Sequence, residues 1–324
     1  MICANLGVGS LPAIDLPSSK IAQWQEDRVR ALSLAMDDAK SRGAEACIIA
    51  GGLFAQDFVA QSLLESTIRA AGGSGLPARY VPLPGELTDV GGRMPQVGGA
   101  SVDNVGEDGG LTIRLGDPPT AIPVVTGTGL EAIEDVSRPH AVVAIIRSGN
   151  DVGVSLNDGS SLVTLGPLAS SAFGDRTGSG YLLVEATDTE ARAEWIECAV
   201  HPFVVREVAI DRPQSTRELV TTVGEAVKEV DRAACLRVEL KGRMPLDVYI
   251  NTEELAEQLG RYFFYVEVVD ECELDLDIAE LDTDVSLLAE FVRRVTGDDS
   301  LSEAEKTRIL RCGWNVLNGK ELAE

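Results

Sequence analysis

The feature that most constrains the fold is an alternation of apolar strand-like runs and amphipathic helical segments near the N-terminus. The run 46–50 is entirely apolar and leads into Gly51-Gly52, a pattern typical of a buried strand that ends in a tight turn. The segments follow in the order strand 1–6, helix 21–42, strand 46–50, helix 54–71 and strand 79–83. This order with short turns predicts a parallel sheet covered by helices on both faces.

A glycine-rich stretch, 84–110, predicts loops and a short hairpin. A second series of strand-like and helical segments follows it and ends in a helical tail. Strand-like runs resume at 121–125, 141–146, 152–156, 161–165, 180–186, 193–200 and 203–211. The remaining order is helix 215–230, strand 235–240, helix 252–260, strand 262–269, helix 285–295 and helix 302–317. We therefore predict an α/β chain with a main domain over 1–205, a smaller α+β cap domain over 206–273, and an acidic linker with a helical tail over 274–324.

Bulk properties disfavour a membrane protein and a general nucleic-acid binder. No run approaches the roughly 18 apolar residues of a membrane span, and the start of the chain lacks the features of a signal peptide, which predicts a cytoplasmic protein. The net charge of −24 opposes sequence-independent binding of a polyanion over the whole surface. Residues 253–290 carry thirteen Asp or Glu against Arg261 alone. A solvated face and a docking surface for a basic partner both stay open for this segment.

The cysteines and histidines give no metal-binding pattern. The six cysteines are widely scattered, without a C-x-x-C pair, and we expect them to be reduced core residues: Cys3, Cys47, Cys198, Cys235, Cys272 and Cys312. The only histidines are His140 and His201. Each stands next to a proline at the edge of a predicted strand, so we interpret both as structural or surface residues.

The ends of the first three predicted strands are the places where a parallel sheet would hold a ligand. They read Asn5-Leu6-Gly7, Gly51-Gly52-Leu53-Phe54 and Pro84-Gly85-Glu86-Leu87-Thr88-Asp89. Here the chain resembles the calcineurin-like metallophosphoesterases, specifically the bacterial SbcD/YhaO-type nuclease subunits of DNA double-strand-break repair. Their strands end in D-x-H-L-G-like, G-D-L-F and G-N-H-D motifs.

The glycine frame of these motifs is present, whereas the metal ligands are replaced. Asn5 stands at the position of the first Asp, Gly7 at that of the His, and Gly52 at that of the bridging Asp. The third motif has Glu86, Leu87 and Thr88 at the positions of Asn, His and Asp. In a later strand, 141–149, Arg147 and Gly149 stand where histidines are expected. The segments 165–174 and 180–184 resemble the P-G-S…F-G-E…G-Y-L-L-V ending of the family.

The resemblance implies a calcineurin-like phosphoesterase sandwich, two mixed sheets flanked by helices, with a degenerate metal site. Family members use two Mn or Mg ions with a bridging carboxylate and imidazoles, and Gly52 has no side chain to bridge anything. We therefore expect no cofactor and no catalytic residue. Asn5, Glu86 and Asp89 are the only nearby groups suited to a hard cation.

The leading functional hypothesis is a catalytically inactive SbcD/YhaO-like subunit that acts as a scaffold. The resemblance implies docking of the helical tail on an SbcC-like ATPase, only indirect or weak contact with DNA, and leaves a homodimer open. The apolar residues expected to dock are Leu287, Leu288, Phe291, Val292, Val295, Ile309, Leu310, Trp314 and Leu317; packing on the protein's own core is the alternative. An active phosphodiesterase or exonuclease with a single-metal site is a second hypothesis, and an anion or small-molecule module that uses the glycine turns is a third.

Overall fold

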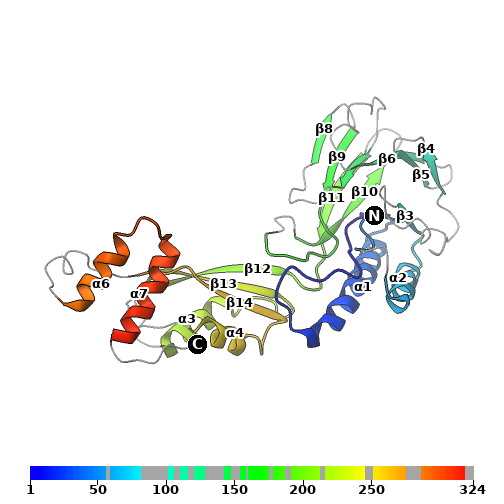
Figure 1. Ribbon diagram of the computed structural model, residues 1–324. Coiled ribbons are helices and arrows are strands. Elements are labelled where there is room, and N and C mark those ends of the chain that lie inside the picture. The colour runs from blue at the N-terminus through cyan, green and yellow to red at the C-terminus, as the bar shows by residue number, and fades with distance from the viewer. Residues whose placement is uncertain are drawn as a thin grey trace. The chain divides into compact units, whose positions relative to one another are not determined.

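The protein is mixed α/β and divides into two compact units, Met1–Phe203 and Val204–Glu324 (Figure 1). The computed structural model describes residues 1–55, 59–81, 101–105, 110–115, 120–127, 142–146, 154–157, 160–174, 178–186, 191–211, 216–244, 251–274 and 286–317. Within these residues, no helix is long and apolar enough to cross a membrane.

The first sheet of the first unit carries the motifs singled out in the sequence. Its strands are β1 (Ile2–Cys3), β2 (Cys47–Ala50), β3 (Ala78–Val81), β10 (Gly180–Ala186) and β11 (Ala191–Glu197). The spatial order is β11-β10-β1-β2-β3. Strands β1, β2 and β3 are parallel, which confirms the parallel arrangement predicted for them. Strand β10 runs antiparallel to both β1 and β11, so the complete sheet is mixed.

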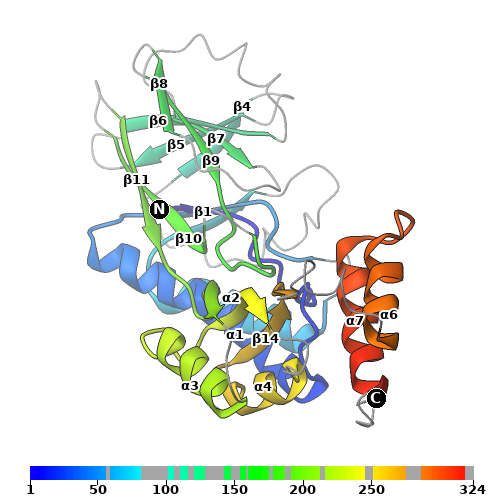
Figure 2. The ribbon, with the colours of Figure 1, turned by 90° about the vertical axis from the view of Figure 1, so that its left-hand side faces the viewer.

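Two helices accompany this sheet, α1 (Ser18–Ser41) and α2 (Gln61–Gly73). They pack against each other, and α1 also contacts β10 (Figure 2). Gly43, with φ of +88°, follows the end of α1, the usual position for a glycine at a helix C-terminus. The expected start of the second helix at residue 54 is wrong. Phe54 instead forms a parallel bridge with Val8, and the Ala55 amide donates to the Val8 carbonyl at 3.0 Å, so this segment extends the sheet before α2 can begin.

The core of this unit lies between α1 and the parallel strands. Its fully buried large side chains include Leu6 after β1, Ile49 on β2, Leu32 and Met36 on α1, and Tyr181 on β10. All residues of β1 and β2 are buried, as a continuous apolar run predicts for strands covered on both faces, and Leu32 and Met36 recur at helical spacing along α1. The apolar packing therefore fixes α1 beside the ends of β1 and β2.

A second sheet in the first unit is also mixed. Its strands are β4 (Ser101–Val105), β5 (Gly110–Leu115), β6 (Thr120–Gly127), β7 (Val142–Ile146), β8 (Val154–Asn157) and β9 (Ser160–Leu165). The order is β4-β5-β6-β7-β9-β8. Strands β6, β7 and β9 are parallel neighbours, whereas β4 with β5, β5 with β6, and β8 with β9 are antiparallel. The first unit therefore contains two mixed sheets.

The second unit contains a smaller α/β layer. Its elements are β12 (Phe203–Asp211), which starts at the unit boundary, α3 (Thr216–Val227), β13 (Cys235–Met244), α4 (Thr252–Leu259), β14 (Tyr265–Asp270) and β15 (Glu273–Leu274). The order is β12-β13-β14, with β15 also paired to β13, and the pairs that β13 makes with β14 and β15 are parallel. Leu219 and Val223 of α3 and Leu255 of α4 bury one face of this sheet.

Two further helices, α6 (Leu287–Thr296) and α7 (Glu303–Leu317), lie side by side in both ribbon views (Figures 1 and 2). A capping box begins α7: the Ser302 amide donates to the Glu305 carboxylate at 2.9 Å, and the Glu305 amide donates to the Ser302 hydroxyl at 3.4 Å. Hydrogen bonds from Ser302 lower the pKa of Glu305. Val292, Val295 and Leu310 form a small core between the two helices, so this hairpin has apolar packing of its own.

All six cysteines are free thiols. Cys3, Cys47, Cys235 and Cys272 are buried, as expected, and Cys198 is half-buried. Cys3 and Cys47 lie close together on β1 and β2, and hydrogen bonding to Cys47 followed by burial raises the pKa of Cys3. Cys312 on α7 is exposed, so the expectation of a core residue is wrong there.

Candidate functional site

The loops that follow β1 and β2 run side by side and are joined by backbone hydrogen bonds. The amides of Asn5, Gly7 and Val8 donate to the carbonyls of Gly51, Gly52 and Leu53 at 3.1, 2.7 and 2.9 Å. The sequence therefore predicted correctly that these two motifs meet at one sheet edge. Because these hydrogen bonds continue beyond β1 and β2, the main chain of the two loops closes this edge of the sheet.

This junction depends on backbone conformations that favour glycine. Gly7, Gly51 and Gly52 have φ of +60°, +69° and +62°, and Asn5 has φ of +52°. Asn5 is the only non-glycine residue with positive φ among those that the structure describes. Asparagine tolerates this region better than most residues. The glycines of these two motifs are thus explained by the turn geometry itself, without any ligand.

The space beside Gly52 is filled. A Cβ atom built on Gly52 would lie 2.4 Å from Asn5 Oδ1 and 2.7 Å from Asn5 Cα. The second of these atoms is backbone and cannot move aside by rotating a side chain. A carboxylate at position 52 is therefore incompatible with this conformation of Asn5, and the residues present do not fit the two-metal centre of the family.

Arg28 of α1 fills the space beside Gly7. A Cβ atom on Gly7 would lie 3.0 Å from Arg28 Nη2. The Arg28 guanidinium donates through Nε to Leu6 O at 2.7 Å, through Nη2 to Ala169 O at 3.0 Å, and through Nη1 to Ser170 O at 3.4 Å. Arg28 is only 5% exposed. A buried cation thus cross-links α1, the loop after β1 and the segment before β10, next to Gly7.

Gln25 binds the rest of the same loop to α1. Its Oε1 accepts from the Gly9 amide at 2.8 Å, and its Nε2 donates to Ser10 O at 2.5 Å. The Ser10 amide donates to Gly7 O at 3.0 Å. The four consecutive amides of residues 7–10 are therefore all engaged within the protein. This pattern argues against an anion site built from them, because such a site needs amides that point at the ligand.

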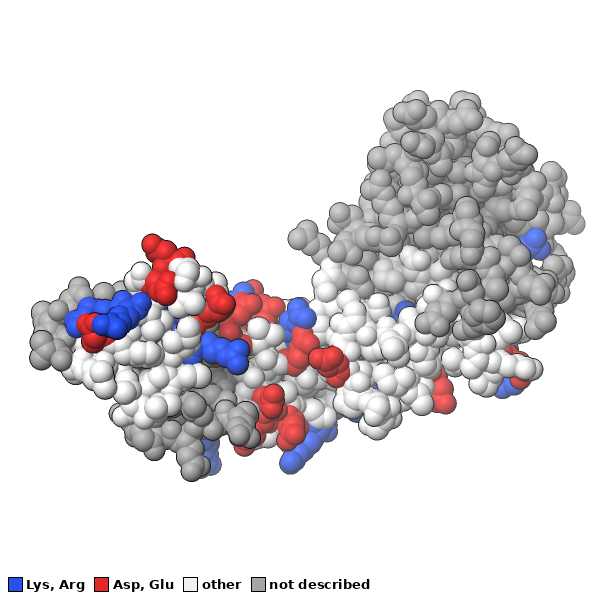
Figure 3. Space-filling view, in the orientation of Figure 1, with Lys and Arg blue, Asp and Glu red and all other residues white. Residues whose placement is uncertain are grey.

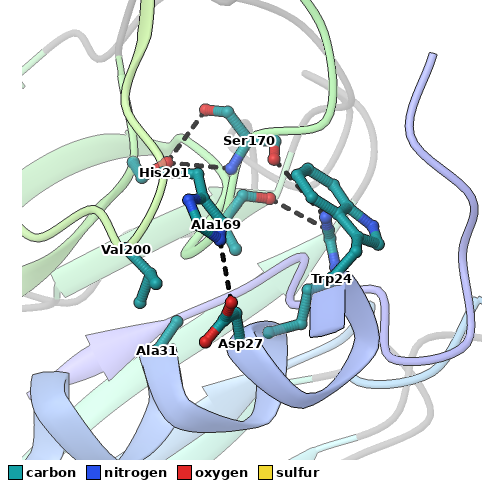
Figure 4. Close-up of a pocket in the computed structure, with 9 residues that line it drawn as sticks. Trp24, Asp27, Ala31, Ala169, Ser170, Val200 and His201 are labelled. Atoms are coloured by element: carbon teal, nitrogen blue, oxygen red, sulfur yellow. Dashed lines mark hydrogen bonds and ion pairs between the residues drawn. The ribbon is translucent and has the colours of Figure 1, made fainter. Parts of the chain in front are cut away.

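A polar cluster that the sequence did not reveal lies beside Arg28 (Figure 4). His201 Nε2 is 2.9 Å from Asp27 Oδ2, and the imidazole stacks on Trp24 with a centroid distance of 6.1 Å and an interplanar angle of 12°. Ser170 and Ser179 line the same small cavity. A signal was available in the sequence, because Asp27 and Arg28 interrupt the apolar, core-facing stripe of a predicted helix.

A Ser, a His and an Asp converge here, but the arrangement lacks room for a substrate. The cavity measures about 10 Å³, which is the space of one water molecule. Ser170 Oγ accepts a hydrogen bond from Ser179 Oγ at 3.1 Å. The chain therefore uses His201 as a buried structural residue, packed between Asp27 and Trp24, in keeping with the structural interpretation of this histidine.

The other predicted site residues cannot be placed. Glu86, Leu87, Thr88, Asp89, His140, Arg147 and Gly149 lie outside the described residues. Of the three weak cation candidates, the structure therefore describes Asn5 alone. Within the described ranges, no group of three or more His, Cys, Asp or Glu side chains could hold a metal ion.

The residues predicted to bind a partner are divided between two sides of the α6–α7 hairpin. Val292 and Leu310 are buried in its core, and Leu288 and Phe291 pack against that core. Leu287 and Ile309 are exposed, and Trp314 is half-buried. A groove of about 530 Å³ is lined by Leu287, Phe291, Arg308, Ile309, Cys312, Gly313, Val316 and Leu317. We call this surface the hairpin groove.

No protein-family model matches this chain, and no curated protein matches it. The function must therefore be inferred from the chemistry of its own residues. Two surfaces stand out: a sheet edge that is closed by Asn5 and Arg28, and an apolar groove that is open.

Proposed function

We propose that this chain is a catalytically inactive, SbcD/YhaO-like subunit that serves as a scaffold for an SbcC-like ATPase. The observation that carries the proposal is the contact at Gly52, where a Cβ atom would lie 2.7 Å from the Asn5 Cα atom. In this proposal the chain keeps the glycine-rich strand ends of a phosphoesterase, but its main chain fills the space that a metal ligand would need. The loops gain rigidity and lose the ability to bind the catalytic metal ions.

The chemical argument concerns what two-metal hydrolysis requires. Two ions about 3.5–4 Å apart need a bridging carboxylate and further ligands, so that one ion generates hydroxide and both stabilise the transition state. Gly7 and Gly52 supply no ligand, and the guanidinium of Arg28 beside Gly7 adds a fixed positive charge that opposes a second cation. Main-chain packing and charge therefore both favour a scaffold over an enzyme.

The arrangement of elements is compatible with a calcineurin-like main domain and a cap. Two mixed sheets with helices occupy the first unit, and a smaller α/β layer begins at β12. The net charge of −24 favours contact with DNA through a partner rather than directly. In this proposal the α6–α7 hairpin carries the docking site, because its groove suits an amphipathic helix.

The proposal is tested by isolating the full-length tagged chain from its native cell. We expect an ATPase with a long coiled coil to co-purify in a stoichiometric amount. We also expect no Mn²⁺-dependent or Mg²⁺-dependent hydrolysis of single-stranded DNA or of a generic phosphodiester by the purified chain. Metal-dependent turnover would favour the single-metal phosphodiesterase instead, and recovery of the chain without any ATPase would refute the scaffold role.

A further inference from the structure

The segment that leads out of the first unit is held on α1 by its last residues (Figure 4). His201 Nε2 lies 2.9 Å from Asp27 Oδ2, and the His201 ring stacks on Trp24. Two residues later, the Phe203 ring meets Trp24 edge-on at a centroid distance of 6.2 Å, and it meets Phe173 edge-on at 5.1 Å. All of these residues belong to the first unit. We call Trp24, Asp27, His201 and Phe203 the α1 clamp.

Each side of the clamp is a short, stiff piece of chain. Trp24 and Asp27 are three residues apart on α1, a spacing that places two side chains next to each other on one helix face. They are only 2% and 9% exposed. On the other side, Pro202 separates His201 from Phe203, and a proline ring fixes φ at about −65°. The two anchors on this segment therefore contact α1 as one element.

Strand β12 is anchored at both of its ends. It begins at Phe203, in the clamp, and its later residues Val208 and Ile210 are buried in the apolar core of the second unit. Residues 205–207 between these anchors are exposed. Charged side chains of both signs are interspersed over the second unit (Figure 3), and residues 205–207 share this solvated character. Domain boundaries usually fall in exposed linkers with few contacts. Here the boundary falls inside a strand, so its freedom depends on the two anchors.

Two features make the clamp easier to open than the apolar core. Trp24 and Phe203 are not part of the main apolar cluster of the first unit. The polar half of the clamp borders a cavity of about 10 Å³, the space of one water molecule, and a water can replace the hydrogen bond between His201 and Asp27. Segments outside the main core open locally at a lower free energy than the whole unit.

We propose that the α1 clamp is a releasable joint: its opening frees the start of β12, and with it the connection between the two units, while both units stay folded. In the closed state, His201 and Phe203 fix the path of the chain from the first unit into β12. In the open state, residues 205–207 gain freedom, because only their far end stays anchored by Val208. The clamp lies within the first unit, and the proposal does not depend on the scaffold role.

Limited proteolysis of the purified full-length chain with trypsin tests the opening. Arg206 is exposed, but cleavage requires a freely moving segment and follows the population of the open state. We expect His201→Ala to release fragments 1–206 and 207–324 at least about tenfold faster than the wild type, because the variant loses a hydrogen bond and a ring stack. Val205→Ala is the control. Val205 is 39% exposed on the same strand, and its replacement should change the rate less than about twofold.

Hydrogen exchange measured by mass spectrometry distinguishes a joint from an ordinary structural contact. In His201→Ala, the amides of residues 199–207 should exchange at least about tenfold faster than in the wild type. The amides of residues 29–41 in α1 and 235–241 in β13 should change less than about twofold. His201→Gln, whose side-chain amide can still donate to Asp27, should restore part of the protection.

Two outcomes of the exchange experiment would overturn the proposal. Equal acceleration over residues 29–41 would show that His201 stabilises the first unit as a whole, and unchanged exchange over residues 199–207 would show that the clamp does not hold β12. If His201→Ala does not fold, Phe203→Leu removes the aromatic half of the clamp and should give the same local pattern. Neither experiment needs an ATPase, so recovery of the chain without one from cells leaves their outcome unchanged.

Discussion

The sheet edge at Gly52 and the hairpin groove differ in how completely they are packed. At the sheet edge, a sequence that resembles an active site is packed shut by main chain, Asn5 and Arg28. At the hairpin, a sequence typical of an ordinary amphipathic tail leaves an apolar groove open. The difference teaches that a glycine-rich motif can report backbone geometry alone, whereas the surface available for function is found where packing is incomplete.

The two regions also differ in how their polar groups are satisfied. Main chain, Arg28 and Gln25 engage the amides and carbonyls around Gly7, Gly9 and Ser10. Such a network is costly to disturb, because each broken bond leaves a buried group without a partner. The groove offers mainly carbon atoms, so a change there leaves no buried polar group without a partner.

The largest expected effect is that of Gly52→Ala, which tests whether the sheet edge is closed. The new Cβ atom would meet Asn5 backbone, and the φ of +62° adds strain, so we expect a loss of about 3 kcal/mol or more in the free energy of unfolding. Gly43→Ala is the control, since Gly43 has φ of +88° but no atom within 4 Å of the added Cβ. It should cost about 1 kcal/mol. Equal losses in urea denaturation would show that the edge has room.

Arg28→Met should destabilise the chain by about 2–4 kcal/mol, because Leu6 O and Ala169 O lose buried donors. Arg30→Met on the same helix is the control. The Arg30 side chain is 66% exposed and approaches Asp27 only to 3.8 Å, so its loss should change stability by less than about 0.5 kcal/mol. If both variants unfold at the same urea concentration as the wild type, the guanidinium does not cross-link α1 to the two loops.

Gly313→Ala tests the other side of the comparison. Its Cβ atom would clash with the ring of Phe291, and because a side-chain tip can rotate away, we expect a modest loss of about 1–2 kcal/mol in the free energy of unfolding. Gly224→Ala in α3 meets no atom within 4 Å and should stabilise by about 0.5–1 kcal/mol. Thermal unfolding monitored by circular dichroism can measure both. A stabilising Gly313→Ala would mean that Phe291 does not pack on α7.

The smallest effect concerns the attachment of α1 to the sheet. The Tyr181 hydroxyl donates to Asp38 Oδ2 at 2.5 Å, and this bond, followed by Arg42, lowers the pKa of Asp38 in the folded chain. The carboxylate therefore contributes stability above its unfolded pKa of about 3.9, and this contribution is lost as the pH falls through the lower folded value. Tyr181→Phe should cost about 0.5–1 kcal/mol near pH 7. The difference from wild type should shrink below about pH 4, and a difference that grew on acidification would contradict this assignment.

Local periodicity was sufficient to predict most strands, both terminal helices and the parallel order of β1, β2 and β3. It placed the start of α2 too early, because the pairing of Phe54 with Val8 is a tertiary contact that leaves no periodic signal. The meeting of Asn5 and Gly52 also followed from the sequence. The position of Arg28 beside Gly7 did not follow, because its burial depends on the packing of α1, and helical spacing gives only the face on which a residue lies.

The contacts of Gly52 and Gly7 have a consequence for protein design. A carboxylate placed at position 52 would collide with Asn5, and an imidazole placed at position 7 would meet Arg28. Either substitution alone would lower stability before it supplied a metal ligand. A designer who wanted a metal site at this sheet edge would therefore have to change Asn5 and Arg28 together with the two glycines.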